Sequence, residues 1–121
     1  MTDSTKNPWP WPGELDAMMA APEYHRLLFE NEHVRVLDAH VDPGHTVPVH
    51  THCWPGILYI LGVSDFVRRD PEGNVLLDTR GSSSHAPAGS AVWGEALTPH
   101  TLQNVGEHQL RNITVELKHL T

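Results

Sequence analysis

Histidines are the residues of this sequence best suited to do chemistry. Ten of them occur among 121 residues. His50 and His52 stand two positions apart in a stretch with the pattern of a strand. Residues i and i+2 of a strand point to the same face, so both imidazoles project into one space. Two converging imidazole nitrogens suit a transition-metal ion, which they bind at about 2.0–2.1 Å. The pair therefore predicts a metal site.

Short strands must position these side chains. From His25 onward the sequence alternates short apolar, β-branched runs with turns. Such a series of strands, with a hairpin turn at residues 70–74, indicates an all-β antiparallel sandwich or barrel. The expected strands cover residues 27–30, 33–41, 47–52, 57–61, 65–69, 75–79, 91–95, 100–105 and 110–118.

The first part of the chain has a different character. Residues 7–13 alternate proline with Trp9 and Trp11 and cannot form a helix or an interior strand. Residues 14–21 favour a short helix that Pro22 stops. We therefore divide the chain into a Pro/Trp-rich N-terminal arm with a short helix, residues 1–24, and a barrel, residues 25–121. The aromatic side chains of the arm are expected to pack on the barrel or on a second subunit.

Two spaced motifs join the histidine pair to a third histidine. Gly44 precedes His50 by five intervening residues, and His100 is followed by Asn104 after three. The patterns Gly44-x5-His50-x-His52 and His100-x3-Asn104 together resemble the two motifs of the cupin superfamily, over about residues 34–118. The resemblance implies a single cupin-type double-stranded β-helix, which is a small antiparallel barrel. It also implies that His50, His52 and His100 bind a metal ion inside that barrel.

The sequence departs from the family pattern in both motifs. Cupins usually carry a glutamate ligand four residues after the second histidine, where this chain has Gly56. In the second motif, Glu95 and Leu97 replace a proline and a glycine. Without that carboxylate, three neutral imidazoles would leave a divalent ion with its full charge and with open positions. Such a centre favours an anionic, bidentate substrate. Gly56→Glu is expected to tighten metal binding while lowering any activity.

Other residues near the motifs have alternative roles. Glu95 is a candidate general base or substitute ligand, or a carboxylate at the rim of the pocket. Tyr59 is a candidate acid that donates a proton to the substrate, or a buried, hydrogen-bonded tyrosine. Asn104 is expected to bond backbone groups at a strand end. Four histidines are expected at the surface: His25, His33, His108 and His119.

Three kinds of function fit this centre. The first is an enzyme that oxidises a small chelating substrate with dioxygen at a divalent transition metal, iron first and otherwise nickel, manganese, zinc or copper. The second is a non-redox metal-dependent isomerase, lyase or hydrolase with Lewis-acid chemistry. The third is a barrel that binds a small molecule without turnover. Oxygen-dependent consumption of a substrate separates the first from the others.

Composition excludes several other classes. Eight Lys and Arg against fifteen Asp and Glu give a net charge of −7, so nucleic acid and anionic membranes are poor partners. A single cysteine, Cys53, excludes an internal disulfide. No apolar stretch approaches the ~20 residues that span a bilayer, and we find no secretory signal. We expect a cytoplasmic protein that forms a homodimer.

Overall fold

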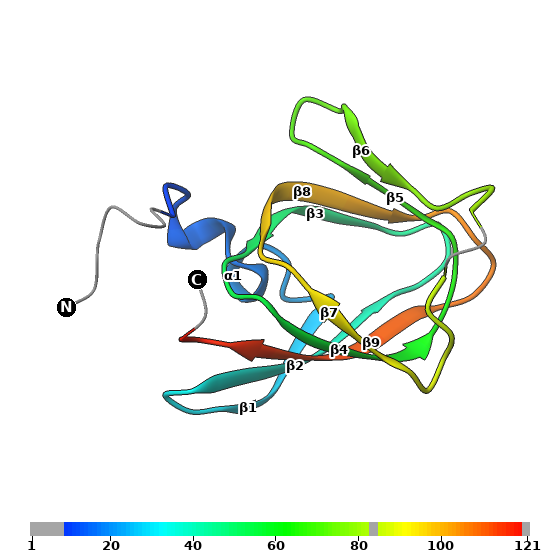
Figure 1. Cartoon of the computed structure of the whole chain (residues 1–121). Coiled ribbons are helices and arrows are strands. Elements are labelled where there is room, and N and C mark those ends of the chain that lie inside the picture. Colours follow the sequence, from blue (N-terminus) through cyan, green and yellow to red (C-terminus); the bar gives the residue numbers. More distant parts are fainter. Residues whose placement is uncertain (1–8, 83–84, 120–121) are drawn as a thin grey trace.

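The computed structural model describes residues 9–82 and 85–119, which form two antiparallel sheets (Figure 1). One sheet has the strand order β1-β2-β9-β4-β7, and the other has the order β3-β8-β5-β6. The strands are β1 (His25–Glu30), β2 (Val34–Val41), β3 (Thr46–His52), β4 (Gly56–Gly62), β5 (Phe66–Arg69), β6 (Val75–Asp78), β7 (Ala91–Gly94), β8 (Leu97–Asn104) and β9 (Leu110–Leu117). The all-β prediction is confirmed, and each expected strand range overlaps an observed strand.

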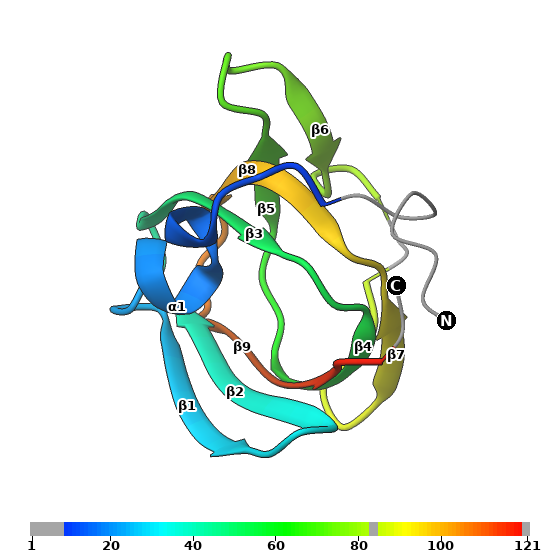
Figure 2. The ribbon, with the colours of Figure 1, turned by 90° about the vertical axis from the view of Figure 1, so that its left-hand side faces the viewer.

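The two sheets close around a common interior (Figure 2). In the first sheet, β2 pairs with β9 along its whole length, from Val34 opposite Leu117 to Val41 opposite Leu110. In the second sheet, β3 pairs with β8, and this pairing sets His50 opposite His100. Alternation along each strand sends every second side chain inward. The result is the antiparallel barrel that the sequence predicted.

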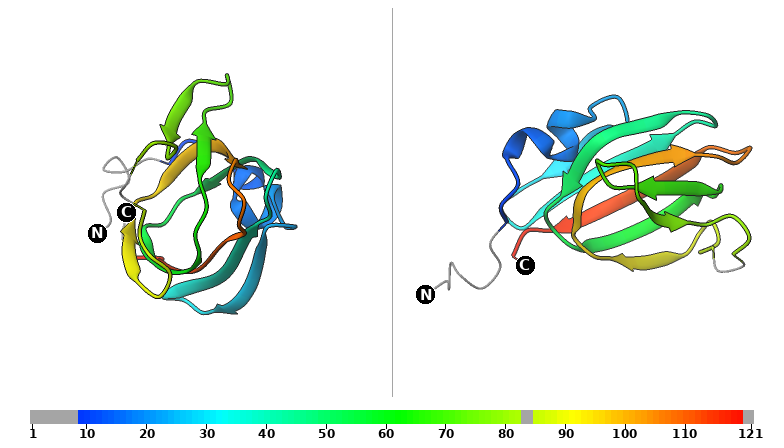
Figure 3. Two further views of the ribbon diagram at one scale, coloured as in Figure 1. Left: turned by 90° about the vertical axis from the view of Figure 1, so that its right-hand side faces the viewer. Right: turned by 90° about the horizontal axis from the view of Figure 1, so that it is seen from above.

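A short helical segment lies along the seam between β1 and β3, which are edge strands of the two sheets (Figures 2 and 3). It consists of the 3-10 turn η1 (Gly13–Leu15) and the helix α1 (Ala17–Ala20). We expected one helix over residues 14–21. Asp16 interrupts it, because its backbone is extended (φ −53°, ψ 143°) while its side chain caps α1. Within the described ranges, no helix is long and apolar enough to cross a membrane.

The buried residues of this barrel are more polar than apolar. Among the described residues, the buried hydrophobic side chains are Ala17, Ala21, Leu37, Val41, Val47 and Val67. The buried polar set is larger and comprises His25, Arg35, Asp38, His50, Thr51, Ser64, His100, Asn104 and Glu116. Buried ionisable groups contribute little to stability compared with well-packed hydrophobic ones. Four of them, His25, His50, His100 and Glu116, line one cavity in the barrel, and their concentration there points to a functional site.

Asn104 forms hydrogen bonds that hold together the ends of strands and the loops between them at one end of the barrel. Its Nδ2 donates to the carbonyl oxygens of Val41 and His108, at 2.8 Å in each case. Its Oδ1 accepts from Ser64 Oγ at 2.9 Å and from the Gly106 amide at 3.0 Å. The residue is fully buried. The structural role predicted for Asn104 is confirmed.

Candidate metal centre

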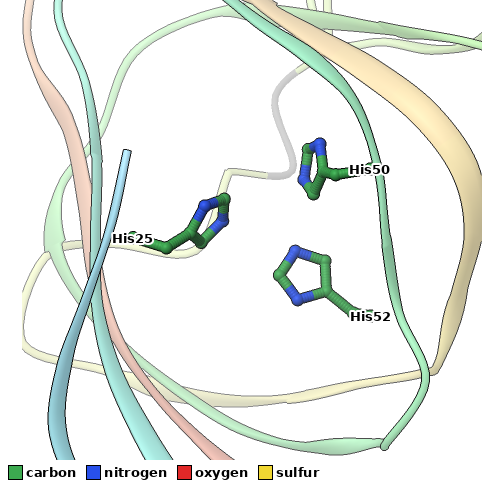
Figure 4. Close-up of side chains that lie close together, drawn as sticks. All are labelled: His25, His50 and His52. Atoms are coloured by element: carbon green, nitrogen blue, oxygen red, sulfur yellow. The ribbon is translucent and has the colours of Figure 1, made fainter. Parts of the chain in front are cut away.

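Three histidines from two strands meet inside the barrel (Figure 4). His50 and His52 come from β3, and their ring centroids are 5.0 Å apart. His25 comes from the start of β1 in the other sheet, with its ring centroid 5.1 Å from that of His50 and 5.2 Å from that of His52. Each ring offers one nitrogen, and these nitrogens lie within 4.8 Å of one another. The three side chains point toward a common space.

Hydrogen bonds fix the tautomer of these rings. The Nδ1 atom of His25 lies 3.0 Å from the Ala21 carbonyl oxygen, and that of His50 lies 2.8 Å from the Pro48 carbonyl oxygen. A carbonyl oxygen can only accept a hydrogen bond, so Nδ1 carries the proton in both rings. His52 forms the equivalent bond to a carboxylate, described below. In His25 and His50, Nε2 therefore keeps its lone pair and is the atom that a metal ion would bind.

His100 stands beside this group on β8. Its ring centroid lies 4.3 Å from that of His50 and 6.0 Å from that of His52. Its Nδ1 donates to the Thr98 carbonyl oxygen at 2.7 Å, so its Nε2 also keeps a lone pair. The structure therefore brings the three predicted metal residues into one region. The three nitrogens that lie closest together, however, belong to His50, His52 and His25. The sequence analysis had expected His100 as the third ligand.

Burial keeps the imidazoles of His25, His50 and His100 neutral. Removal from water lowers the pKa of His25 to about 4, that of His50 to about 2 and that of His100 to about 4. Repulsion from the neighbouring His52 ring, when it is charged, adds to each of these shifts. At neutral pH the three rings therefore present lone pairs without first losing a proton.

A buried carboxylate orients the remaining ring, that of His52. Glu116 on β9 is 1% exposed, and its Oε2 lies 3.2 Å from His52 Nδ1. Its Oε1 accepts from Arg35, whose guanidinium also forms two bonds to Asp16, at 2.8 and 2.9 Å. Burial alone would raise the pKa of Glu116, but hydrogen bonds from His52 and Arg35 outweigh it and hold that pKa below its usual value. Carboxylates in this position fix the orientation of metal-binding histidines.

Gly56 lies directly opposite Glu116 in the β4–β9 pair. The sequence analysis treated Gly56 as the place of a missing glutamate ligand. A Cβ atom on Gly56 would lie 2.0 Å from the carbonyl oxygen of Val115 on β9 and 2.9 Å from its carbonyl carbon. No side chain fits there unless the β9 backbone moves. The expectation that Gly56→Glu would tighten metal binding is therefore overturned.

His25 and Glu116 are the two residues of this centre that sequence reasoning missed. His25 was expected at the surface, but it is only 6% exposed. Its neighbours in the sequence form no metal-binding motif, and it reaches the site because β1 pairs with β2, with His25 opposite Ala39. Glu116 carried no such signal either, because it alternates in phase with Asn112 and Thr114, a polar set that a sequence pattern places toward solvent but that lines the cavity here.

The two predicted catalytic side chains differ in their position relative to the cavity. Glu95 is exposed at the rim of the cavity and accepts from Trp93 Nε1 at 2.7 Å. Tyr59 is 45% exposed. Its neighbours on β4, Leu58 and Ile60, line the cavity, so alternation turns Tyr59 to the outer face of the sheet. The expected position of Tyr59 beside the metal centre is therefore corrected.

A cavity of about 650 Å³ opens beside the histidines. His25, His50, His52 and His100 form part of its wall. Much of the remaining wall is apolar and includes Leu58, Ile60, Phe66, Val92, Leu97 and Leu102. A space of this size, with a few convergent polar groups in an apolar surround, suits a small organic molecule.

The donor set fits a divalent transition metal. Imidazole nitrogens with free lone pairs, each ring fixed by a bond at Nδ1, are the ligands found in zinc, iron, nickel and copper sites. The ligand nitrogens of His25, His50 and His52 lie within 4.8 Å of one another, so side-chain movements that draw them closer would let all three bind one ion. These three histidines could therefore hold a metal ion.

Comparison with known proteins establishes the fold. No family model and no curated protein matches the sequence. A cupin domain from Bordetella pertussis Tohama I is 17% identical, and the match covers 77% of this chain and 90% of that one with a TM-score of 0.60. An RmlC-like cupin family protein with a double-stranded β-helix fold from Methanocaldococcus jannaschii is 16% identical, with 77% of each chain covered and a TM-score of 0.53.

A third similar structure is the polyketide cyclase RemF from Streptomyces resistomycificus. It is 20% identical, and the match covers 81% of this chain and 67% of that one with a TM-score of 0.50. At these identities the likeness concerns the fold. The chain has the cupin fold, a double-stranded β-helix, as its two histidine motifs predicted.

Proposed function

We propose that this protein is a metal-dependent enzyme that oxidises a small chelating substrate with dioxygen inside the barrel. The observation that carries the proposal is the group of His25 and His50, which are buried, and His52, which is partly exposed, on the wall of an apolar cavity. These three, with His100 as a fourth, would hold a divalent transition metal. Once bound, the ion would supply Lewis-acid polarisation of substrate oxygens and one-electron redox chemistry.

The residues around the histidines favour an anionic substrate. An imidazole that binds a metal ion through one nitrogen brings no negative charge, so the three grouped histidines would not offset the charge of a divalent ion. The nearest carboxylate, Glu116, is already bonded to Arg35 and His52. A substrate that brings its own negative charge would therefore be attracted to this end of the cavity. Iron is the metal that we propose first, and an all-imidazole donor set also accepts nickel, manganese, zinc or copper.

The protein itself contributes orientation and exclusion of water. Glu116 and the carbonyl oxygens of Ala21 and Pro48 hold their three rings with Nε2 free. The apolar cavity wall, with Leu58 and Leu102, lowers the local dielectric constant and strengthens interactions with a charged substrate. Ligands that are oriented before the substrate arrives need no reorganisation during the reaction.

A non-redox reaction is the second candidate. Sites made of imidazole ligands are also typical of catalytic zinc, and the polyketide cyclase RemF shares the fold with a TM-score of 0.50. In this alternative the same histidines would hold zinc, which would act as a Lewis acid on a carbonyl oxygen. Glu95 at the rim is then the carboxylate in reach of the cavity that could exchange a proton.

Dioxygen consumption tests the first candidate against the second. Untagged protein is loaded with Fe²⁺ or, separately, with Zn²⁺, and is incubated with a panel of 2-oxo acids and β-diketones in an oxygen electrode. We expect uptake of dioxygen matched to loss of substrate with Fe²⁺, and none in His50→Ala. Turnover that persists without oxygen, or with Zn²⁺, would favour the non-redox enzyme. Substrate binding without product under every metal would contradict both.

A further inference from the structure

A half-buried arginine that forms no ion pair among the described residues lines the same cavity. Arg68 on β5 lines the cavity, and its Nε atom is buried without a hydrogen-bond partner among the described residues. Its guanidinium carbon lies 5.9 Å from the centroid of the Phe66 ring, a contact that does not neutralise charge. Burial lowers the pKa of Arg68, yet an arginine in a protein stays protonated. A guanidinium whose Nε is removed from water without a partner is less favourable than one that an anion pairs with.

The carboxylates that line the cavity are already engaged. Glu116 is bonded to Arg35 and His52. Asp78 accepts from Arg80 at 2.8 Å, and Glu95 accepts from Trp93 at 2.7 Å. None of the ion pairs found within residues 9–82 and 85–119 includes Arg68. The interior therefore holds a cation whose matching anion is not supplied by the described part of the chain.

Strand register sets Arg68 next to the histidines. Arg68 lies opposite Leu102 in the β5–β8 pair, and His100 is two residues before Leu102 on the same strand. Arg68 and His100 are thus diagonal neighbours on one face, a relation that separates residues by roughly 7–8 Å. After burial, the charge of Arg68 is among the causes that lower the pKa of His100. Arg68 and the histidines therefore line one cavity from neighbouring strands, so a small molecule in that cavity can contact both.

We propose that Arg68 binds the carboxylate of the substrate, while a second oxygen of the same molecule faces the histidines. A guanidinium and a carboxylate match in shape and can form two parallel hydrogen bonds. The inference rests on the proposed function and narrows its substrate class. The substrate is a small carboxylic acid with an apolar body and a carbonyl or hydroxyl group at its other end.

Binding of a matched acid and ester tests this assignment. The probes are 4-oxo-4-phenylbutanoate and its methyl ester, which differ in charge but little in size. Their affinities are measured by calorimetry on metal-free protein, so that Arg68 is tested apart from any metal. We expect the wild type to bind the acid at least about tenfold more tightly than the ester, as a charge-assisted bond would provide. Arg68→Gln should lose this preference, and Arg68→Lys should keep part of it.

The control removes a positive charge elsewhere. Arg26→Gln changes the net charge equally, but the Arg26 side chain is 71% exposed and pairs with Asp38, so the preference for the acid should persist. Arg68→Leu should melt at or above the wild-type temperature, because it removes a half-buried charge that forms no ion pair among the described residues. A fall of many degrees would mean that Arg68 serves the fold and would overturn the assignment.

The outcomes separate this inference from the proposed function. Equal affinity of the wild type for acid and ester, or an undiminished preference in Arg68→Gln, would overturn the role of Arg68. Loss of the preference in Arg68→Gln, in a protein that binds no metal, would uphold the carboxylate site and reject the metal-dependent chemistry.

Discussion

His25 joins the two sheets at the candidate metal centre, because it is the one grouped histidine that comes from β1. Replacing it with alanine removes one of three converging nitrogens. The affinity for a divalent transition metal should therefore fall by at least about tenfold. Competition with a chelator of known affinity measures this change. His33→Ala is the control, because the His33 side chain is 64% exposed and pairs with Glu32. Equal metal affinity in His25→Ala and the wild type would remove His25 from the centre.

Residues of the site differ in how far the sequence could predict them. His50 and His52 follow from the alternation of a strand, which needs no knowledge of its neighbours. His25 and Glu116 depend on which strands pair and in what register, as in the pairing of Gly56 with Glu116. Register arises from packing across the whole barrel. The residues that neighbour His25 and Glu116 in the sequence therefore do not predict it.

At the scale of the strands, β4 and β9 approach each other closely at Gly56. Because a Cβ atom there would lie 2.0 Å from a backbone carbonyl oxygen, Gly56→Ala should lower the free energy of unfolding by about 1–3 kcal/mol or more. Urea denaturation measures the change. Gly13→Ala is the control, because a Cβ atom on Gly13 would have no heavy atom within 4 Å. A Gly56→Ala variant as stable as Gly13→Ala would show that the two strands lie further apart.

Asp38 on β2 links strands on both sides. It accepts from Arg111 on β9 at 2.7 and 3.1 Å, and Arg26 on β1 lies 3.6 Å away. The Arg111 hydrogen bonds lower the pKa of Asp38 in the folded state. Its carboxylate therefore adds stability at neutral pH, which is lost as the pH falls below about 4, the value in unfolded chains.

Asp38→Asn should consequently be less stable than the wild type at pH 7, by about 1 kcal/mol or less because both arginines are partly exposed. The difference should shrink as the pH falls toward 3, below the unfolded-state pKa of about 3.9. Urea denaturation of both proteins across this range gives the comparison. A difference that stays constant with pH would mean that the ionised carboxylate is not its source.

The strands themselves were largely predictable. Apolar alternation and turn residues located each of them, and the Asp70–Asn74 hairpin turn formed as expected, with the Asp70 side chain accepting from the Asn74 amide at 2.9 Å. The short helix was less predictable, because Asp16 has an extended backbone that interrupts the helix, and its side chain bonds Arg35. A long-range ion pair of this kind overrides local helix propensity.

At the scale of the whole molecule, the outer face of β4 is apolar and open. Ile57, Tyr59 and Leu61 are 37%, 45% and 41% exposed, and Trp93, opposite Ile57 on β7, is 49% exposed. The sequence analysis expected the arm to pack on the barrel or on a second subunit, and that expectation stays a prediction; Trp9 and Trp11 contact each other, with ring centroids 4.8 Å apart. We propose that in a homodimer a second copy of this chain covers the β4 face, since one self-complementary patch suffices for a twofold contact.

Light scattering after gel filtration tests this arrangement. The wild type should be a dimer at micromolar concentrations, and Leu61→Glu should be a monomer because it places a charge in the contact. Val75→Glu is the control, because Val75 is 57% exposed on β6, away from this face. A monomeric wild type, or a dimer that survives Leu61→Glu, would contradict the proposed contact.

The central claim is that the histidine group binds a divalent transition metal, and metal content tests it most directly. Untagged protein, purified without chelator, is analysed by plasma mass spectrometry together with a His50→Ala/His52→Ala double variant. We predict roughly one ion per chain in the wild type and loss of that ion in the double variant, with the circular dichroism spectrum of the barrel retained. A wild type that holds no metal and takes up none of iron, nickel, manganese, zinc or copper would contradict the claim. So would a double variant with undiminished metal content.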